Sequence, residues 1–170
     1  PIYTFYLSKS AGVSPATGKQ LYYCYYRYAV DEKGAMVTER CPEYVTDDVS
    51  LATMSKYYYG SRQPLFSGSI ASNFTIFKDF DLSFLTTYSL GGRIMDGLYD
   101  SAMHVTYPGN NWHRNILRRW QKPGDVTDIP MVEIGGSYAS VGESLVDASY
   151  FAIKNITFGY TLPSRLTEKA

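Results

Sequence analysis

The sequence has no run of about 18 apolar residues, so no membrane-spanning helix is expected. It also has no excess of either charge, because 16 lysines and arginines balance 16 aspartates and glutamates. This balance argues against a nucleic-acid partner, which recognises a basic surface. What the chain has in abundance is tyrosine, with 17 among 170 residues. Tyrosine collects at membrane interfaces and on surfaces that stack against sugars or peptides.

Two neighbouring stretches, residues 66–77 and 80–91, alternate apolar and polar side chains and are joined only by Lys78-Asp79. Because the side chains of a strand point alternately to opposite faces, this pattern predicts a hairpin with one apolar face. The apolar side chains are Phe66, Ile70, Phe74 and Ile76 in the first arm and Phe80, Leu82, Phe84, Tyr88 and Leu90 in the second. Each arm has about a dozen residues, and about 9 to 11 cross a bilayer when tilted. We therefore predict an all-β fold, as a segment of an antiparallel transmembrane β-barrel.

Residues 148–163 return to the same alternation and predict a further membrane strand. Its expected apolar face carries Tyr150, Ile156, Phe158, Tyr160 and Leu162. Lys154 interrupts this face, and we expect it toward the outer end of the strand, where a lysine reaches the headgroups. Pro163 cannot donate to a ladder and fits the end of a strand.

The rest of the chain is expected outside the membrane. Residues 1–65 predict outer strand ends and an extracellular hairpin, and residues 66–92 the membrane hairpin. Residues 93–147 lack sustained alternation and predict a long extracellular loop, which at that length is usually functional. The short turn near Lys78 is expected to face the periplasm.

The extracellular hairpin contains both cysteines. Its arms, residues 21–30 and 35–41, flank a predicted four-residue turn that ends at Gly34. If Val30 pairs with Ala35, Cys24 lies opposite Cys41 and a disulfide can form. A slipped register or two free thiols is the alternative.

The sequence offers little for chemistry. His104 and His113 do not have a recognised metal-ligand spacing, and no nucleophile motif frames either of them. Asp125 and Asp128 could hold calcium, but residues 122–125 are better explained as a type II turn. We therefore predict no enzyme, no catalytic residue, no metal and no cofactor.

Aromatic residues of the long loop are the candidates for contact with a ligand or partner. They are Tyr99, Tyr107, Trp112, Trp120 and Tyr138. Aromatic faces stack on sugar rings and bury a large area against a protein partner. The competing interpretation is that they pack the loop itself.

The chain is expected to be a piece of a longer protein. Pro1 is not an initiator, and no signal segment precedes it. A barrel must close so that no strand edge stays unpaired in lipid, and the few strands predicted here are too few to close one.

Several motifs in succession give the sequence a family resemblance. They are residues 6–22, 60–69, 80–85 and 120–128, and the run Asp147-Ala-Ser-Tyr-Phe-Ala-Ile-Lys-Asn-Ile-Thr-Phe-Gly-Tyr-Thr-Leu-Pro163. In this order they resemble the SusC/RagA-type TonB-linked outer-membrane transporters, in the C-terminal part of the β-barrel without its final strands.

The resemblance implies a barrel of about 22 strands in the outer membrane of a Gram-negative bacterium. It implies a plug domain, absent from this chain, through which the TonB complex acts. It also implies a SusD-like surface lipoprotein as partner and an oligosaccharide or a peptide as cargo.

Two other classes fit part of the pattern. A passive porin would share the alternation without the family motifs. A soluble carbohydrate-binding module would bury the apolar strand faces against a second sheet. Strand length and the small number of strands argue against the soluble module, and the sequence does not identify the cargo.

Overall fold

The computed structural model describes residues 3–103, 109 and 111–163. The chain divides into two compact units, one of Pro1–Gly60 with Ile94–Val146 and the other of Ser61–Arg93 with Asp147–Ala170. We call them the outer unit and the strand unit. Strands dominate both, the helices are short, and the two three-stranded sheets are antiparallel. The predicted all-β fold is confirmed.

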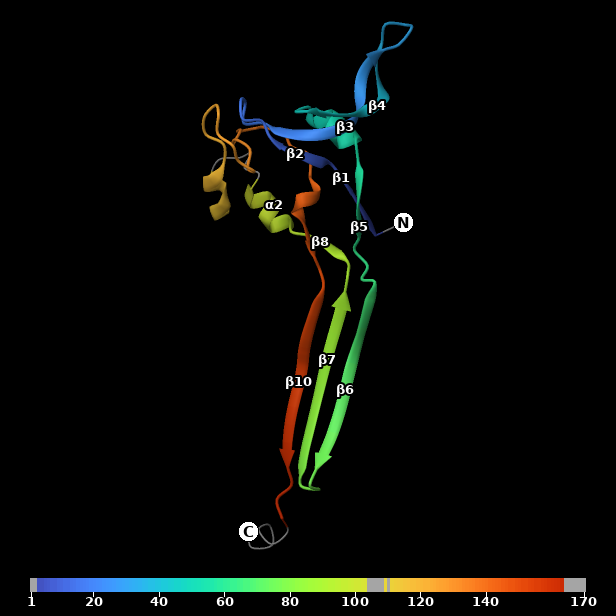
Figure 1. The fold of residues 1–170 in the computed structure, drawn as a ribbon, viewed down its shortest axis with the longest axis vertical. Helices are drawn as coiled ribbons and strands as arrows, with labels where there is room; N and C mark the ends of the chain where they lie inside the picture. The colour runs from blue at the N-terminus through green and yellow to red at the C-terminus, as the bar shows by residue number, and fades with distance from the viewer. Residues whose placement is uncertain (1–2, 104–108, 110, 164–170) are drawn as a thin grey trace. The chain divides into compact units, whose positions relative to one another are not determined.

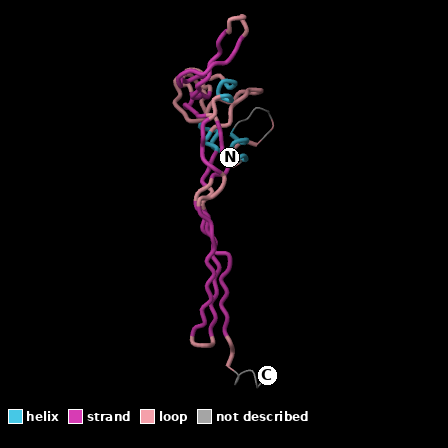
Figure 2. The backbone as a smooth tube through the Cα atoms, turned by 90° about the vertical axis from the view of Figure 1, so that its right-hand side faces the viewer, coloured by secondary structure: helices cyan, strands magenta, loops and turns pink. Residues whose placement is uncertain are grey.

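The strand unit is one sheet in the order β10-β7-β6. Strands β6 (Phe66–Ile76), β7 (Phe80–Leu90) and β10 (Tyr150–Tyr160) have 11 residues each and lie side by side (Figures 1 and 2). Strands β6 and β7 pair without interruption from Phe66 with Leu90 to Ile76 with Phe80, which confirms the predicted hairpin.

The turn of this hairpin differs from the expected two residues. Since Ile76 pairs with Phe80, residues 77–79 form the turn, and both Phe77 and Lys78 have a positive φ, of 54° and 71°. The backbone carbonyl of Asp79 accepts a hydrogen bond from the amide of Thr161 at 2.7 Å, which ties the turn to the chain just beyond β10.

A β-bulge at Lys154 corrects the predicted face of β10. Ile153 pairs with Thr86 and Asn155 with Leu85, so Lys154 is an extra residue without a ladder partner. The extra residue reverses the alternation. Phe151 and Ile153 therefore share a face with Ile156, Phe158 and Tyr160. Tyr150, expected on the apolar face, pairs with Ser89 on the opposite one.

With this register the three strands form a sheet with two distinct faces. We define the apolar face by the side chains that pairing places together: Phe66, Ile70, Phe74, Ile76, Phe80, Leu82, Phe84, Leu90, Phe151, Ile153, Ile156, Phe158 and Tyr160. The polar face carries mainly serine, threonine, asparagine and alanine, together with Asp81 and Leu85.

The sheet of the outer unit contains β2 (Lys9–Val13), β3 (Gln20–Val30) and β4 (Met36–Thr46), in the order β2-β3-β4. Its turn has one residue more than predicted. The Asp31 carboxylate accepts the amides of Lys33 and Ala35 at 2.9 and 2.8 Å, which draws Ala35 into the turn. Val30 therefore pairs with Met36, and the predicted pairing with Ala35 is wrong.

The cysteines do not face each other across this hairpin. The ladder is irregular between Cys24 and Tyr26, and Cys24 pairs with Tyr44. Both cysteines are free thiols, Cys24 buried and Cys41 partly buried. The open alternative of a different register and two thiols is the one that the structure adopts.

Helix α1 (Val49–Met54) follows β4 and closes the core of the outer unit. The Asp48 carboxylate accepts the amides of Ser50 and Leu51, an N-cap that fixes where the helix begins. Its buried residues Leu51 and Ala52 pack with side chains from β3 and from the long loop. This cluster consists of Tyr22, Cys24, Leu51, Ala52, Ala139 and Val141.

The long loop has more structure than its sequence predicts. It contains β8 (Arg93–Met95), α2 (Gly97–Met103), the 3₁₀ helices η1 (Arg114–Arg118) and η2 (Gly142–Ser144), and β9 (Leu145–Asp147), which pairs with β8. Met103, Ile116 and Ile129 form a second small core there. Strands β1 (Thr4–Leu7) and β5 (Tyr57–Ser61) make a further two-stranded sheet. None of the described helices has the length and apolarity needed to cross a membrane.

Candidate functional site

The apolar face of the strand unit is exposed along both edge strands, β6 and β10, and half-buried over most of the central strand β7. Phe66, Phe151 and Phe158 expose 69, 67 and 65% of their surface, and Ile156 exposes 63%. Large apolar patches of this kind mark contact with a partner or a membrane. Aromatic pairs order the face across the strands: Phe74 stacks with Phe84, and the Phe80 ring lies 4.6 Å from that of Tyr160 and 5.7 Å from that of Phe158.

Three small residues, Gly68, Ser72 and Thr86, interrupt the apolar face, and the fold compensates for Gly68 and Thr86. Thr86 is buried, and its hydroxyl donates to the Ile70 carbonyl at 3.3 Å, so no free hydroxyl faces the apolar side chains there. Gly68 pairs with Tyr88, and a Cβ at Gly68 would lie 2.6 Å from the Tyr88 hydroxyl oxygen. The Tyr88 ring therefore covers the surface that Gly68 leaves open.

The opposite face is suited to water. Thr75 donates to the Asp81 carboxylate at 2.9 Å, and Asn155 and Thr157 hydrogen-bond to each other. A sheet with one aromatic and aliphatic face and one hydroxyl-rich face separates an apolar phase from an aqueous one. Each edge strand, β6 and β10, has β7 as its one partner among the described strands, so its outer backbone groups have no ladder partner there.

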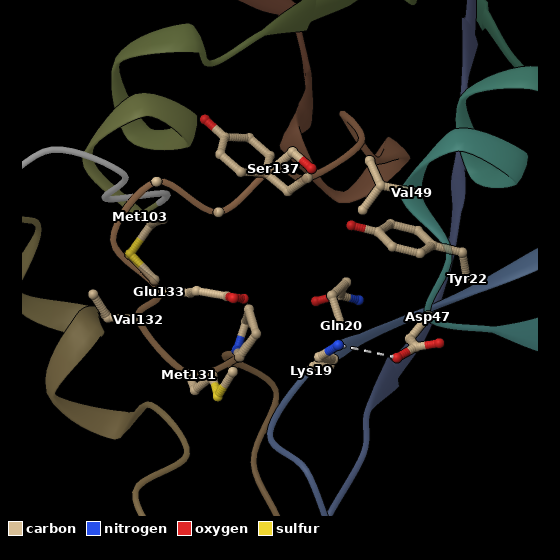
Figure 3. Close-up of a pocket in the computed structure, with 14 residues that line it drawn as sticks. Lys19, Gln20, Tyr22, Asp47, Val49, Met103, Met131, Val132, Glu133 and Ser137 are labelled. Atoms are coloured by element: carbon tan, nitrogen blue, oxygen red, sulfur yellow. Dashed lines mark ion pairs between the residues drawn. The ribbon is translucent and has the colours of Figure 1, made fainter.

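The outer unit contains a cavity of about 380 Å³. Four segments line it: the start of β3, the turn before α1, the end of α2, and residues 130–138 of the long loop. Figure 3 shows the Glu133 carboxylate and the Gln20 amide projecting toward its middle, with Lys19 and Asp47 paired at one side. The volume lies within the range of small-molecule sites, about 300 to 1,000 Å³.

Two tyrosines, Tyr22 and Tyr138, form part of the wall of this cavity. Tyr22 is buried, and its hydroxyl oxygen accepts the amide of Ala139 at 3.2 Å, which holds the loop against β3. Burial raises the pKa of the Tyr22 phenol, and burial also raises the pKa of Tyr138. Both phenols are therefore neutral at physiological pH and can donate a hydrogen bond.

Of the five aromatic candidates, Tyr138 lines this cavity. Trp120 packs within the unit: its indole N–H donates to the Pro15 carbonyl at 2.9 Å, and its ring lies where a Cβ on Gly18 would be, 2.4 Å from the nearest ring atom. Gly18 also has a φ of +72°, so glycine is required there for two reasons. Trp120 thus clamps the turn before β3 to the long loop.

The remaining candidates are dispersed. The Tyr99 hydroxyl accepts Asn115 at 3.0 Å, and its ring packs edge-on against His113 beside the second core. Trp112 exposes 42% of its surface. Tyr107 and His104 lie outside the described residues. Gln20 and Glu133 of the cavity could not be predicted from the sequence, because no local pattern marks two residues that only the fold brings together.

The Asp125 carboxylate, considered as a calcium ligand, instead stabilises a turn of the backbone. Its carboxylate accepts the amides of Gln121 and Lys122, both at 3.1 Å, and its own amide donates to the Lys122 carbonyl. Gly124 has a φ of +96°, as the third residue of a type II turn requires. Within the described part of the chain, no group of three or more histidine, cysteine, aspartate or glutamate residues could hold a metal ion.

No protein-family model and no curated protein matches the chain. Among solved structures, one of the RagAB peptide transporter superposes over 96% of the chain with a TM-score of 0.68 and 25% identity. The chain resembles part of that transporter. A structure of the RagAB peptide importer in a "closed-closed" state matches over 95% of the chain, with a TM-score of 0.64 and again 25% identity.

The chain spans 17% of the length of either matched chain. At 25% identity, the likeness extends the resemblance to SusC/RagA-type transporters from sequence motifs to the fold. This structural similarity supports a transporter-associated all-β segment.

Proposed function

We propose that this chain is a barrel-wall and outer-loop portion of a TonB-dependent outer-membrane transporter. The observation that carries the proposal is the three-stranded sheet with a predominantly apolar, exposed face and a polar opposite face. Strands of 11 residues are about 36 Å long, at about 3.3 Å per residue. At a tilt of about 40° they span about 28 Å, close to the apolar band of about 25 Å that such barrels present to lipid.

The unpaired edges support the same proposal. In lipid every backbone N–H and C=O needs a partner, so β6 and β10 would each pair with a neighbouring strand of the wall. A soluble carbohydrate-binding module is less well supported, because residues such as Phe158 and Ile156 stay exposed instead of packing against a second sheet.

Oligopeptides are the proposed cargo, ahead of oligosaccharides, because the matched structures are those of a peptide transporter and importer. A SusD-like surface lipoprotein is the proposed partner, and the TonB complex is the proposed source of energy. Both would act with parts of the protein beyond this sheet.

Uptake by a strain that makes the full-length protein tests the proposal. A gene-deletion strain complemented with that protein should accumulate a labelled oligopeptide mixture, and disruption of TonB should abolish the accumulation. Uptake that persists without TonB would point to a passive porin. Recovery of the protein in a soluble fraction would exclude a wall segment altogether.

A further inference from the structure

We propose that the cavity of the outer unit binds a primary amine or a guanidinium group carried on an aliphatic stem, as in a lysine or arginine side chain. The proposal concerns binding alone and does not depend on whether the protein transports what it binds.

Two acceptors without a protein donor among the described residues face the cavity, and Glu133 is exposed to solvent there. Among the residues that the structure describes, no N–H, O–H or cationic group contacts the Glu133 carboxylate, and Figure 3 shows it directed toward Gln20. The Gln20 amide nitrogen donates to the Ser10 hydroxyl at 2.6 Å and to the Gly12 carbonyl at 3.0 Å. These bonds fix the amide orientation and leave its oxygen for a donor in the cavity.

The charges of the lining favour a cation. Lys19 is paired with Asp47 at 3.5 Å, so these two side chains largely neutralise each other. Glu133 then leaves the lining with one net negative charge. A protonated amine or a guanidinium has several donors and no acceptor, which matches a carboxylate and an amide oxygen that both lack a protein donor.

The remaining walls fit an apolar stem. Val49, Met103, Met131 and Val132 line the cavity beside the two acceptors. Thioether side chains are flexible and polarizable and adapt to guests of different shape. A linear aliphatic chain can therefore lie against these residues while its cationic end reaches Glu133, whereas a neutral chain of the same length would displace water from both acceptors without replacing its hydrogen bonds.

The test uses the full-length protein in detergent and titrates N-acetyl-lysine-N-methylamide by isothermal titration calorimetry. The matched probe N-acetyl-norleucine-N-methylamide has a similar stem without the charge. We expect saturable binding of the lysine probe, no saturable binding of the norleucine probe, and a Kd for the lysine probe that rises with added salt.

Three variants localise the site. Glu133→Gln removes the charge but keeps the shape, and should raise the Kd roughly tenfold, as expected for one charge-assisted hydrogen bond. Ser137→Leu fills the cavity without changing its charge and should abolish binding. Glu32→Gln is the matched control, since it makes the same change in the exposed turn between β3 and β4, and should leave the Kd unchanged.

The source of the cation is tested with two further probes, 1,5-diaminopentane and the tripeptide Ala-Lys-Ala. Tighter binding of the tripeptide would assign the site to a peptide side chain, and tighter binding of the diamine to a free polyamine; both results support the cavity. Equal binding of the lysine and norleucine probes, an equal effect of Glu32→Gln and Glu133→Gln, or no saturable binding of any amine would overturn the proposal. None of these results bears on TonB-dependent uptake.

Discussion

A lysine substituted for Ile156 should destabilise the protein far more than one substituted for its neighbour Thr157. Ile156 pairs with Phe84 on the apolar face, and Thr157 pairs with Ser83 on the polar face. Ile156 lies four residues before the end of β10, which corresponds to about 13 Å along the strand. At a tilt of about 40° this is about 10 Å of depth, close to the midplane of an apolar band of about 25 Å.

A lysine on the lipid face of such a barrel costs about 2 to 4 kcal/mol at the midplane. This cost corresponds to a decrease of roughly 30- to 900-fold in the ratio of folded to unfolded protein. Thr157→Lys instead places the charge on the side expected to face water, where the same residue costs little. The expected difference between the two variants is thus at least about 2 kcal/mol.

Urea titration of the full-length protein in liposomes, followed by the heat-modifiable mobility of the folded barrel on gels, measures this difference. Thr157→Lys should unfold at nearly the wild-type urea concentration, and Ile156→Lys at a clearly lower one. Equal losses for the two variants, or a larger loss for Thr157→Lys, would refute the assignment of faces.

Three further predictions concern other parts of the chain. Deletion of Lys154 should leave the folded yield within about twofold of wild type, because only the bulge residue is lost and the faces are kept, whereas deletion of Ala152 should reduce the yield strongly by moving residues to the wrong face. Trp120→Ala should destabilise the outer unit by about 1 to 3 kcal/mol and increase trypsin cleavage after Lys19 and Arg119, while Trp120→Phe should retain most of the packing on Gly18. Native protein at pH 8 should react with a thiol reagent at the partly buried Cys41 and not at Cys24, because Cys24 is fully buried and burial raises the pKa of its thiol. The unfolded chain loses the Cys24 proton at a lower pH than the folded chain does. The free energy of unfolding should therefore fall as the pH rises through the raised pKa of Cys24. Equal reaction at both thiols would contradict the burial of Cys24. Resistance of Trp120→Ala to trypsin would contradict the role of Trp120 in packing on Gly18, and loss of folding on deletion of Lys154 would contradict the bulge.

The strand unit could be predicted from sequence because a period of two is a local signal. Alternation over residues 66–90 was sufficient to give the hairpin and its apolar face. The bulge at Lys154 also leaves a local signal, since the apolar positions change phase from Phe151 and Ile153 to Ile156 and Phe158. That change of phase is what an extra residue in a ladder produces, and an apolar face without a bulge would have required Lys154 to lie on it.

The outer unit could not be predicted to the same depth. The Asp31 side chain sets the length of the turn by accepting two amides, which shifts the pairing by one residue from the predicted register. The irregularity between Cys24 and Tyr26 then shifts the remaining pairs further. The cavity depends on packing between segments far apart in the sequence, such as the contact of Tyr22 with Ala139. Helix α1 has only six residues, which is too short for helical periodicity to be detected.

Lipid accessibility on the two faces of β6 tests the central claim most directly. In a Cys24→Ala, Cys41→Ser background, single cysteines at Phe74 and at its neighbour Asn73 are labelled with an environment-sensitive fluorophore in the full-length protein. The protein is then reconstituted into liposomes that contain lipids with a quencher on the acyl chain. Strong quenching at position 74 and little at position 73 is the predicted result. Equal quenching at both positions, or none at either, would contradict a sheet whose apolar face contacts lipid.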